Sequence, residues 1–482
     1  MRFQPKHSSS SVPGFANFSR RDFVKWAGGC GAMSSTSILS QLLSLQLTQT
    51  AAADSGAGED YKAIVCLFLF GGIDSFNVLT PYDQSEYDNY ASVRSNLALD
   101  RGTLLEIDSG QESRPLGVHP ALPQLKSLYD SGAAAFVANV GALVRPTDQS
   151  NYESVQKPLG LFSHSDLQQH WQTSIPQSRS AATGWAGRMA DLLLSTYPGN
   201  PNISMNMSLG RLNLFQTGSD VVPYVINSNG ATPVSGLGNN NPSDRVYTRI
   251  MNELYPSAAD SELGGLYSDL LQRTVAINKR VSIDAALEFN DATSGDSSTT
   301  FPDSGLGDQL KMVSRAIAGR NTLGQNRQIF FVSAGGWDHH DEVTNNMANM
   351  LPGIDAALKA FYDETVALGV ADCVTTFTAS DFARTLSSNG NGSDHAWGGN
   401  MIVIGGAVNG ATTYGTYPLD LSLNNDLDLG RGRLIPTTSV DLLNAELALW
   451  FGVSESQLVD ILPNVHYFNR LGTGGAPLGF LV

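Results

Sequence analysis

The stretch from Arg327 to His340 reads RQIFFVSAGGWDHH, an apolar run that ends at two glycines and is followed by an aspartate and two histidines. A short apolar run closed by glycines is typical of a buried strand in a parallel sheet. The chain of 482 residues holds 8 histidines, so two adjacent histidines beside a carboxylate stand out. The stretch therefore predicts a strand with a functional site at its carboxyl end, formed by Asp338, His339 and His340.

Similar patterns recur along the chain and predict its fold class. The predicted strands cover residues 61–70, 133–140, 327–332, 373–378 and 401–404, and the predicted helices cover residues 122–129, 347–368 and the segment opened by residues 163–166. Alternating strands and helices indicate an α/β fold with a mostly parallel central sheet and helices on both faces. Such sheets place their sites outside the carboxyl ends of the strands, where the acidic residues and histidines of this sequence lie.

The N-terminal segment has the composition of an export signal. Residues 19–25 read SRRDFVK and precede a weakly apolar stretch rich in Gly, Ala and Ser, and residues 51–53 offer a small-residue cleavage site. This pattern resembles a twin-arginine signal. We therefore expect a signal peptide at 1–53, the twin-arginine translocase as a partner during export, and one periplasmic or secreted domain at 54–482.

The remaining chain shows loop insertions but no membrane anchor. No other run reaches the roughly 18 to 20 apolar residues of a membrane span, so we expect no transmembrane segment in the mature chain. Tracts rich in Gly, Asn, Ser and Asp at 227–245, 290–308 and 387–394 indicate loops or insertions within one principal domain.

The charge balance excludes one class of partner. The chain holds 29 Lys and Arg against 45 Asp and Glu, which gives a formal net charge of −16 at pH 7. An acidic surface repels the phosphates of nucleic acids, so we expect no nucleic-acid partner. Any anionic substrate would depend on local cations at its site, and a metal ion could supply them.

The cysteines argue against a disulfide scaffold. Cys66 and Cys373 stand inside apolar runs, and a small buried hydrophobic residue is the simpler interpretation of each. Each precedes an aspartate by eight positions, Asp74 and Asp381 respectively. A disulfide would therefore be possible if the two strands were neighbours in register.

Six sequence blocks resemble the DUF1501 family, a bacterial family of twin-arginine-exported proteins without a settled function. They are GGIDSFNVLTP (71–81), GVHPAL (117–122), FSHSDLQ (162–168), GGWDHH (335–340), SDFART (380–385) and SDHAWGGNMIVIGGAV (393–408). The blocks span nearly the whole mature chain in order. The family is similar in fold to the alkaline phosphatase and sulfatase superfamily, whose members hydrolyse or transfer phosphate and sulfate esters at a two-metal site.

The resemblance implies a metal site built from separated stretches. The implied ligands are Asp74, Asp338, His340, Asp381 and His395. Two positions depart from the superfamily pattern, because His340 follows Asp338 by two positions rather than four, and Phe382 stands where a histidine usually follows the aspartate. One set keeps Asp338, His340 and His395 and can leave an open coordination position. The second keeps only two aspartates, which a serine could join, and this suits magnesium, calcium or no metal.

The resemblance also implies a nucleophile and its helpers. Ser163 opens a predicted helix where the superfamily keeps its nucleophile, and the free amides of a helix N-terminus favour a deprotonated hydroxyl. A serine there is equally typical of a helix N-cap, so both interpretations stay open, and Ser165 is a weaker rival. Arg384 is a candidate clamp for an anionic group, with a pair to Asp381 as the alternative. His164 is a candidate to assist at the helix start.

The function implied by the resemblance is hydrolysis. We expect an exported metal-dependent hydrolase of phosphate or sulfate esters, with an anionic ester as substrate and one or two divalent ions (Zn, Mn, Mg or Ca) as cofactors. The alternative is a non-catalytic exported surface-binding or assembly protein that retains the fold. Phe382 favours that alternative, and a shared fold does not establish chemistry.

Overall fold

The computed structural model describes residues 60–110, 114–200, 203–228, 230–231, 299–418, 420–469 and 475–482. These residues belong to one compact unit, Asp60–Val482. The expected signal peptide at 1–53 lies outside the described residues, and so do parts of the tracts at 227–245 and 290–308. Within the described ranges, no helix combines the length and the apolar character that a membrane crossing requires.

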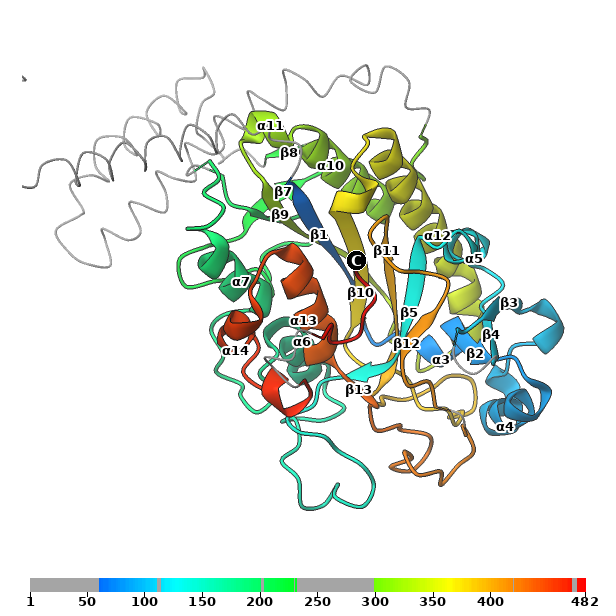
Figure 1. The fold of residues 1–482 in the computed structure, drawn as a ribbon. Coiled ribbons are helices and arrows are strands. Elements are labelled where there is room, and N and C mark those ends of the chain that lie inside the picture. The colour runs from blue at the N-terminus through cyan, green and yellow to red at the C-terminus, as the bar shows by residue number, and fades with distance from the viewer. Residues whose placement is uncertain are drawn as a thin grey trace, which may run out of the picture. The chain divides into compact units, whose positions relative to one another are not determined.

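A ten-stranded sheet forms the centre of the described part of the chain (Figure 1). Its order is β12 (Thr413–Gly415), β5 (Ala134–Gly141), β11 (Gly399–Gly405), β10 (Val374–Ser380), β1 (Lys62–Phe70), β9 (Arg327–Gly335), β6 (Asn206–Ser208), β7 (Tyr224–Asn227) and β8 (Gly230–Ala231), with β13 (Thr438–Ser439) paired to β5. β1 is parallel to both of its neighbours, β9 and β10. The predicted α/β fold with a mostly parallel sheet is confirmed.

Helices cover both faces of the sheet, and alternate residues of the strands face opposite layers. In β1, Val65 and Leu67 belong to one hydrophobic cluster, whereas Cys66 and Phe68 belong to the other. The first cluster is completed by α5 (Pro123–Asp130), α10 (Gly305–Ala318) and α12 (Val343–Ala367), and the second by α6 (His164–Thr173), α7 (Trp185–Leu193), α13 (Val440–Phe451) and α14 (Leu458–Ile461). This arrangement explains why the central strands are apolar on both sides.

The remaining elements lie around this core. They are a small sheet of β2 (Leu79–Pro81), β4 (Pro115–Val118) and β3 (Leu105–Asp108), the helices α3 (Ser75–Val78), α4 (Gln84–Arg94) and α11 (Arg320–Leu323), and the 3-10 helices η1 (Ser95–Leu97), η2 (Arg101–Thr103), η4 (Ala371–Cys373), η5 (Glu455–Gln457) and η6 (Val465–Tyr467). The predicted strands and helices are present, with ends shifted by a few residues. α12, for example, begins at Val343 rather than 347.

The disulfide between Cys66 and Cys373, which required their strands to be neighbours in register, is not formed. β1 and β10 are neighbours, but their register places Cys66 opposite Phe377. Cys373 lies in η4, before β10 begins, and both cysteines are free. Each cysteine precedes its aspartate by eight positions, but this equal spacing did not predict the register of the strands. The reason is that β1 and β10 end at different distances before those aspartates.

Strand β11 departs from the parallel pattern, as β8 does at the far edge of the sheet, and β11 decides where the site forms. β11 is antiparallel to both β10 and β5. The residues just before β11 therefore lie at the same edge of the sheet as the carboxyl ends of β10, β1 and β9. The tract at 387–394 forms part of this loop, as predicted.

Candidate metal centre

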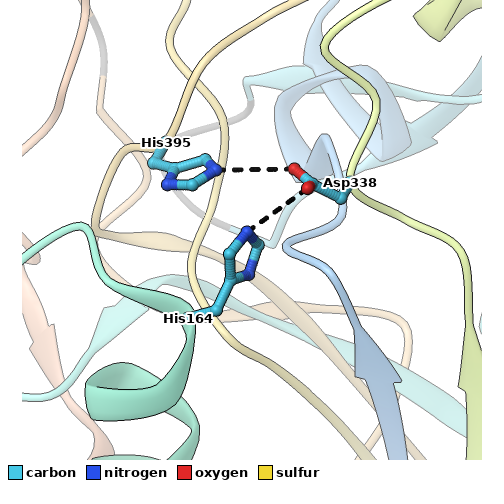
Figure 2. Close-up of side chains that lie close together, drawn as sticks. All are labelled: His164, Asp338 and His395. Carbon is cyan, nitrogen blue, oxygen red and sulfur yellow. Dashed lines mark ion pairs between the residues drawn. The ribbon is translucent and has the colours of Figure 1, made fainter.

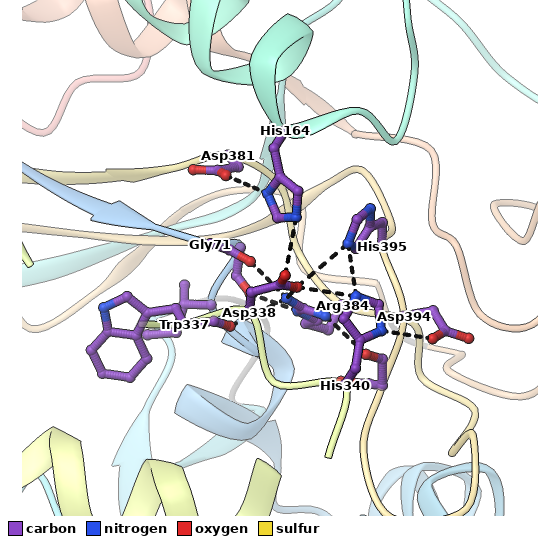
Figure 3. A network of polar contacts seen from close by, with 12 residues as sticks. Gly71, His164, Trp337, Asp338, His340, Asp381, Arg384, Asp394 and His395 are labelled. Carbon is purple, nitrogen blue, oxygen red and sulfur yellow. Dashed lines mark hydrogen bonds and ion pairs between the residues drawn. The ribbon is translucent and has the colours of Figure 1, made fainter. Parts of the chain in front are cut away.

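Segments far apart in the sequence bring polar side chains to this edge (Figure 3). Asp338 and His340 follow β9, Asp381 follows β10, and His395 lies in the loop before β11. His164 is the first residue of α6, which packs against the end of β10. The carboxyl ends of the parallel strands thus lie together at this edge of the sheet. Because β11 runs in the opposite direction, the loop that precedes it reaches the same edge.

The approach of β1 to the Asp338 segment requires a glycine. Gly71 has φ +118°, and a Cβ atom there would lie 2.5 Å from the backbone nitrogen of Asp338. The backbone N–H of Trp337 donates to the carbonyl of Phe70 at 3.1 Å. Trp337 itself is buried, and its indole donates to a backbone carbonyl rather than lining a pocket. These contacts fix the position from which the Asp338 carboxylate projects.

The carboxylate of Asp338 is the centre of the cluster (Figure 2). Its Oδ2 lies 3.4 Å from Nε2 of His164, and its Oδ1 lies 3.4 Å from Nε2 of His395. Oδ1 also lies 3.1 Å from Nε2 of His340. The Nε2 atoms of His340 and His395 are 3.0 Å apart. Because the Asp338 side chain is 45% exposed, the cluster is open to a ligand from solvent.

Each of the three imidazoles has an oxygen acceptor within hydrogen-bond distance of its Nδ1 atom. The oxygen acceptors are Oδ2 of Asp381 for His164 at 2.7 Å, the carbonyl of Phe162 for His395 at 2.8 Å, and Oδ1 of Asp394 for His340 at 3.0 Å. An oxygen acceptor fixes the proton of a neutral imidazole on Nδ1, so the lone pair lies on Nε2. Three such lone pairs therefore face the carboxylate of Asp338, the arrangement that outer partners give to metal-binding histidines.

The protonation states suit cation binding. Partial burial lowers the pKa of His395 most, the hydrogen bond to the Phe162 carbonyl opposes it, and the nearby His164 and Arg384 lower the pKa further against a smaller effect of Asp338. His395 is therefore neutral near pH 7. Partial burial raises the pKa of Asp338, but the hydrogen bond and charge of Arg384 outweigh it, and the net pKa lies below the ordinary value. The cluster thus offers a carboxylate and neutral imidazole.

The donor set fits a divalent metal ion. Ligand atoms of His164, Asp338 and His395 all lie within 4.8 Å of one another. Nε2 of His164 is buried and has no hydrogen-bond partner among the described residues. Bond lengths of about 2.0–2.1 Å place the donors of a tetrahedral zinc ion about 3.3 Å apart, and Nε2 of His164 and Nε2 of His395 each lie 3.4 Å from a carboxylate oxygen of Asp338. Imidazole and carboxylate ligands suit zinc or manganese.

The sequence matches the family described as "Protein of unknown function (DUF1501)" over residues 61–429. The chain belongs to the DUF1501 family. A search among curated proteins finds no match.

Solved structures similar to this DUF1501 protein share little sequence with it. Ps i-CgsB is 9% identical, with 84% of this chain and 77% of that chain covered and a TM-score of 0.34. Ps i-CgsB in complex with k-i-k-neocarrahexaose is 10% identical, with coverages of 85% and 76% and a TM-score of 0.33. The lipoteichoic acid synthase LtaP from Listeria monocytogenes is 9% identical, with coverages of 74% and 68% and a TM-score of 0.29. At these TM-scores the likeness carries no argument about chemistry.

Arg384 is buried behind Asp338 in this DUF1501 protein. Its guanidinium forms an ion pair with Asp338, not with Asp381. Its Nε donates to the carbonyl of Gly72 at 2.8 Å, and Nη1 donates to the carbonyl of Ser393 at 2.9 Å. Nη2 donates to the carbonyl of Gly71 at 2.6 Å. With its donors directed to protein oxygens, Arg384 orients Asp338 and joins three loops.

Ser163 is the N-cap of α6. Its hydroxyl accepts from the backbone N–H of Asp166 at 3.5 Å and lies 3.2 Å from the hydroxyl of Ser165. The Ser163 side chain also interacts with the carboxylate of Asp166, but Arg179 pairs with that carboxylate and lowers its pKa, which makes it a weak base for the Ser163 proton. The geometry therefore supports the capping interpretation, and His164, the next residue, points into the cluster instead (Figure 3).

The two aspartates implied for a second ion have other partners. Asp381 is fully buried and accepts from His164 and from the side-chain amide of Gln168 at 2.8 Å. Asp74 is buried in an ion pair with Arg94, which also donates to the carbonyl of Thr385 at 3.0 Å. Arg94 thus places a positive charge beside Asp74, where the resemblance implies a metal ion.

Sequence reasoning missed three residues that support the cluster. Asp394 lies in the SDHAWGG block directly before His395, so its place in the block was a usable signal. Gln168 stands one turn after His164 on α6, which an i, i+4 argument could have found. Phe162 contributes a backbone carbonyl, and no side-chain pattern reports such a role. Its φ of +72° is visible only in the structure.

Proposed function

We propose that this protein binds one divalent metal ion at Asp338, His395 and His164 and hydrolyses phosphate or sulfate esters there. The observation that carries the proposal is the orientation of the imidazoles, whose Nδ1 atoms are held by oxygens while the Nε2 atoms face one carboxylate. Such an arrangement costs stability if no cation or proton compensates the facing lone pairs. The similarity in fold between the DUF1501 family and an ester-hydrolysing superfamily motivates the same function.

His164 rather than His340 is proposed as the third ligand. The His164 side chain is 31% exposed and is backed by the fully buried Asp381, whereas the His340 side chain is 46% exposed and is backed by the partly exposed Asp394. A rigid ligand loses less freedom on binding an ion. His340 remains beside Asp338 and His395, where an imidazole can exchange protons with solvent.

The residues of the site have separate roles in the proposed reaction. A bound ion supplies Lewis acidity at an ester oxygen. Asp338 stays ionised because Arg384 holds it, and it keeps the negative charge that binds the cation. When both of its ring nitrogens are protonated, His340 can give the Nε2 proton to the leaving oxygen and afterwards take up the proton that the attacking water releases, with Asp394 stabilising the protonated ring. Water is the proposed nucleophile, because Ser163 is engaged as a cap.

A single ion is proposed rather than two. The Arg94 guanidinium bonded to Asp74 supplies the positive charge that a second ion would supply. Both hydrogen bonds given to Asp381 use its Oδ2 atom and direct that carboxylate toward His164 and Gln168. A second ion would lie close to the buried Arg94 guanidinium and would have only the Oδ1 atoms of Asp74 and Asp381, which are buried without a hydrogen-bond partner among the described residues, as free carboxylate ligands.

Metal content and turnover test the proposal together. Residues 54–482 would be purified, stripped with chelator, and assayed with zinc, manganese, magnesium or calcium on 4-nitrophenyl phosphate and sulfate. We expect one bound ion per chain and metal-dependent release of 4-nitrophenol, with both lost in His395→Ala. Metal binding without turnover of any ester in a wide panel would remove the hydrolase proposal and leave the binding site.

The second candidate is a non-catalytic binding protein that retains the fold. Two observations favour it: Arg384 directs its donors inward rather than toward a ligand, and Ser163 serves as a cap. This candidate predicts metal binding without ester turnover. Ester turnover by the metal-loaded protein therefore separates the two candidates.

Export through the twin-arginine pathway is part of the proposal. The motif SRRDFVK at 19–25 supports it, and a cofactor loaded before export would suit a pathway that carries folded proteins. Replacing Arg20 and Arg21 by lysine should trap the precursor in the cytoplasm. Unchanged export of this variant would point to another route.

A further inference from the structure

A pocket of about 340 Å³ opens beside the metal cluster. It is lined by Gln149, Tyr152, Glu153, Phe162, Leu429 and Arg433, together with part of Asp428. Small-molecule sites commonly have volumes of about 300–1,000 Å³. The pocket combines aromatic and aliphatic side chains with an amide, a carboxylate and a guanidinium, so it can bind the face and the edge of a polar ring.

Phe162 joins the pocket to the cluster. Its carbonyl accepts the Nδ1 hydrogen of His395, while its ring lines the pocket. Its φ of +72° lies in the left-handed region, where a bulky residue is a genuine outlier. Such strain persists where the surroundings enforce it, and it is concentrated at functional sites. A ligand in the pocket would therefore lie next to the residue that orients His395.

Arg433 places a cation over the ring of Phe162, with 5.1 Å between the guanidinium carbon and the ring centroid. Its Nε donates to the carbonyl of Gly430 at 2.9 Å, and Nη2 donates to the carbonyl of Leu429 at 3.4 Å. Within the described part of the chain, no hydrogen bond from Nη1 to a protein oxygen is found. Arg433 is half-buried, so its charge is only partly screened by water.

The loop that carries Arg433 is built around Asp428. The Oδ1 atom of this buried carboxylate accepts from the backbone N–H groups of Gly430 and Gly432 at 2.7 and 2.8 Å. Its Oδ2 accepts from the N–H of Asn424 at 3.0 Å. Gly430, Arg431 and Gly432 all have positive φ. Of the two carboxylates that line the pocket, Asp428 is therefore directed to backbone amides, and Glu153 lies 3.9 Å from the ammonium of Lys157.

Arg431 extends the same loop to the metal cluster. Its guanidinium lies 2.6 Å from Oδ2 of Asp394, the carboxylate whose Oδ1 holds His340. The two arginines of one loop thus reach both the pocket and the cluster. Arg431 is neutralised by Asp394, whereas Arg433 lines the pocket, and in a chain with a net charge of −16 this guanidinium favours an anionic ligand there.

We propose that this pocket binds a sugar unit that carries a negatively charged group, with Arg433 as the residue that recognises the charge. A sugar ring has an apolar face that packs on Phe162, Tyr152 and Leu429, and edge hydroxyls that hydrogen-bond to Gln149 and Glu153. A planar guanidinium holds two oxygens of a carboxylate or sulfate at once. The proposal rests on the proposed function and names the alcohol portion of its ester substrate.

Direct binding tests this proposal without turnover. Calorimetric titration of metal-stripped residues 54–482 would use glucose 6-sulfate, glucuronate, neutral glucose and benzoate. We expect both charged sugars to bind, glucose to bind at least tenfold more weakly, and Arg433→Gln to weaken both charged sugars by tenfold or more. Benzoate binding more tightly than either sugar would contradict the sugar class.

Arg101→Gln is the matched control. Arg101 also lies over an aromatic ring, 4.5 Å from the ring centroid of Tyr82, and its Nε donates to a backbone carbonyl at 2.7 Å. The Arg101→Gln variant should bind the charged sugars as wild type does. Thermal unfolding of this variant and of Arg433→Gln would confirm that both fold. Equal binding by wild type and Arg433→Gln, or no binding of either charged sugar at millimolar concentration, would overturn the proposal. Charged-sugar binding without any ester turnover would instead remove only the hydrolase proposal.

Discussion

The Nδ1 atom of His164 lies 2.7 Å from Oδ2 of Asp381, a carboxylate with no exposed surface. The pair connects the first residue of α6 to the end of β10 and leaves Nε2 of His164 directed at Asp338 (Figure 3). A buried carboxylate behind an imidazole fixes the ring and strengthens it as a ligand. This relationship explains how a side chain at an otherwise ordinary helix start can become part of the proposed metal centre.

Asp381→Asn should therefore weaken metal binding without removing a proposed ligand. An amide can still accept one hydrogen bond but lacks the charge, so zinc affinity should fall by about 10- to 100-fold, as for other outer partners of metal ligands. Competition with a zinc chelator measures the change. Asp130→Asn, at a partly exposed aspartate paired with Lys126, is the control and should bind zinc as wild type does. Equal affinities for both variants would contradict the role of Asp381.

Substitutions of Ser163 distinguish its interpretation as a helix cap from its interpretation as a nucleophile. Ser163→Ala should lower the free energy of unfolding by about 1 kcal/mol, because an N-cap is lost. Ser163→Asn should restore that stability, since asparagine is an equally good cap. We expect ester hydrolysis by both variants. If both lose hydrolysis while binding metal normally, Ser163 is the nucleophile and the capping interpretation is incomplete.

Gly71→Ala should damage the site through the backbone. A methyl group at φ +118° would lie 2.5 Å from the backbone nitrogen of Asp338, so the Asp338 segment must move. We expect a loss of more than about 1 kcal/mol in unfolding free energy, together with weaker metal binding. Gly353→Ala is the matched control, because this glycine lies in α12 and a methyl group there would meet no neighbouring atom within 4 Å. The control should gain about 0.5–1 kcal/mol.

Asp441 should make stability depend on pH. Burial raises the pKa of this carboxyl to about 7, against opposing effects from Ser439 and Arg188. The folded state then holds a proton that the unfolded chain, with an ordinary pKa of 3.8, has lost, so this contribution to stability declines as pH rises from about 4 to about 7. Asp441→Asn should therefore raise the melting temperature relative to wild type more at pH 8 than at pH 4. Calorimetry at the two pH values checks this, and an equal effect at both would contradict it.

The sequence predicted the parallel core because β1 and most of β9 are apolar on both faces and the Thr-rich β10 has the β-branched composition of a buried strand. It also placed Asp338 and Asp381 at one edge, since both directly follow such strands. The orientation of β11 was not predictable, because an apolar run has the same composition in either direction. That orientation is what brings the loop with His395 to the cluster.

The ion pairs at the site could not be predicted from the sequence, for a different reason. The sequence offered two interpretations of Arg384, a clamp for an anionic group or a local pair with Asp381 three positions before it, yet the guanidinium pairs with Asp338. Arg94 lies 20 positions from Asp74 and pairs with it inside the core. Both choices depend on how loops from separate strands pack, and no local pattern reports that packing.

The most direct measurement of the central claim is anomalous diffraction from a crystal of residues 54–482 grown with zinc, recorded on both sides of the zinc absorption edge. We predict one anomalous peak at about 2.0–2.2 Å from a carboxylate oxygen of Asp338 and from Nε2 of His164 and His395. No peak at this cluster, or a peak held by Asp74 and Asp381 instead, would contradict the claim.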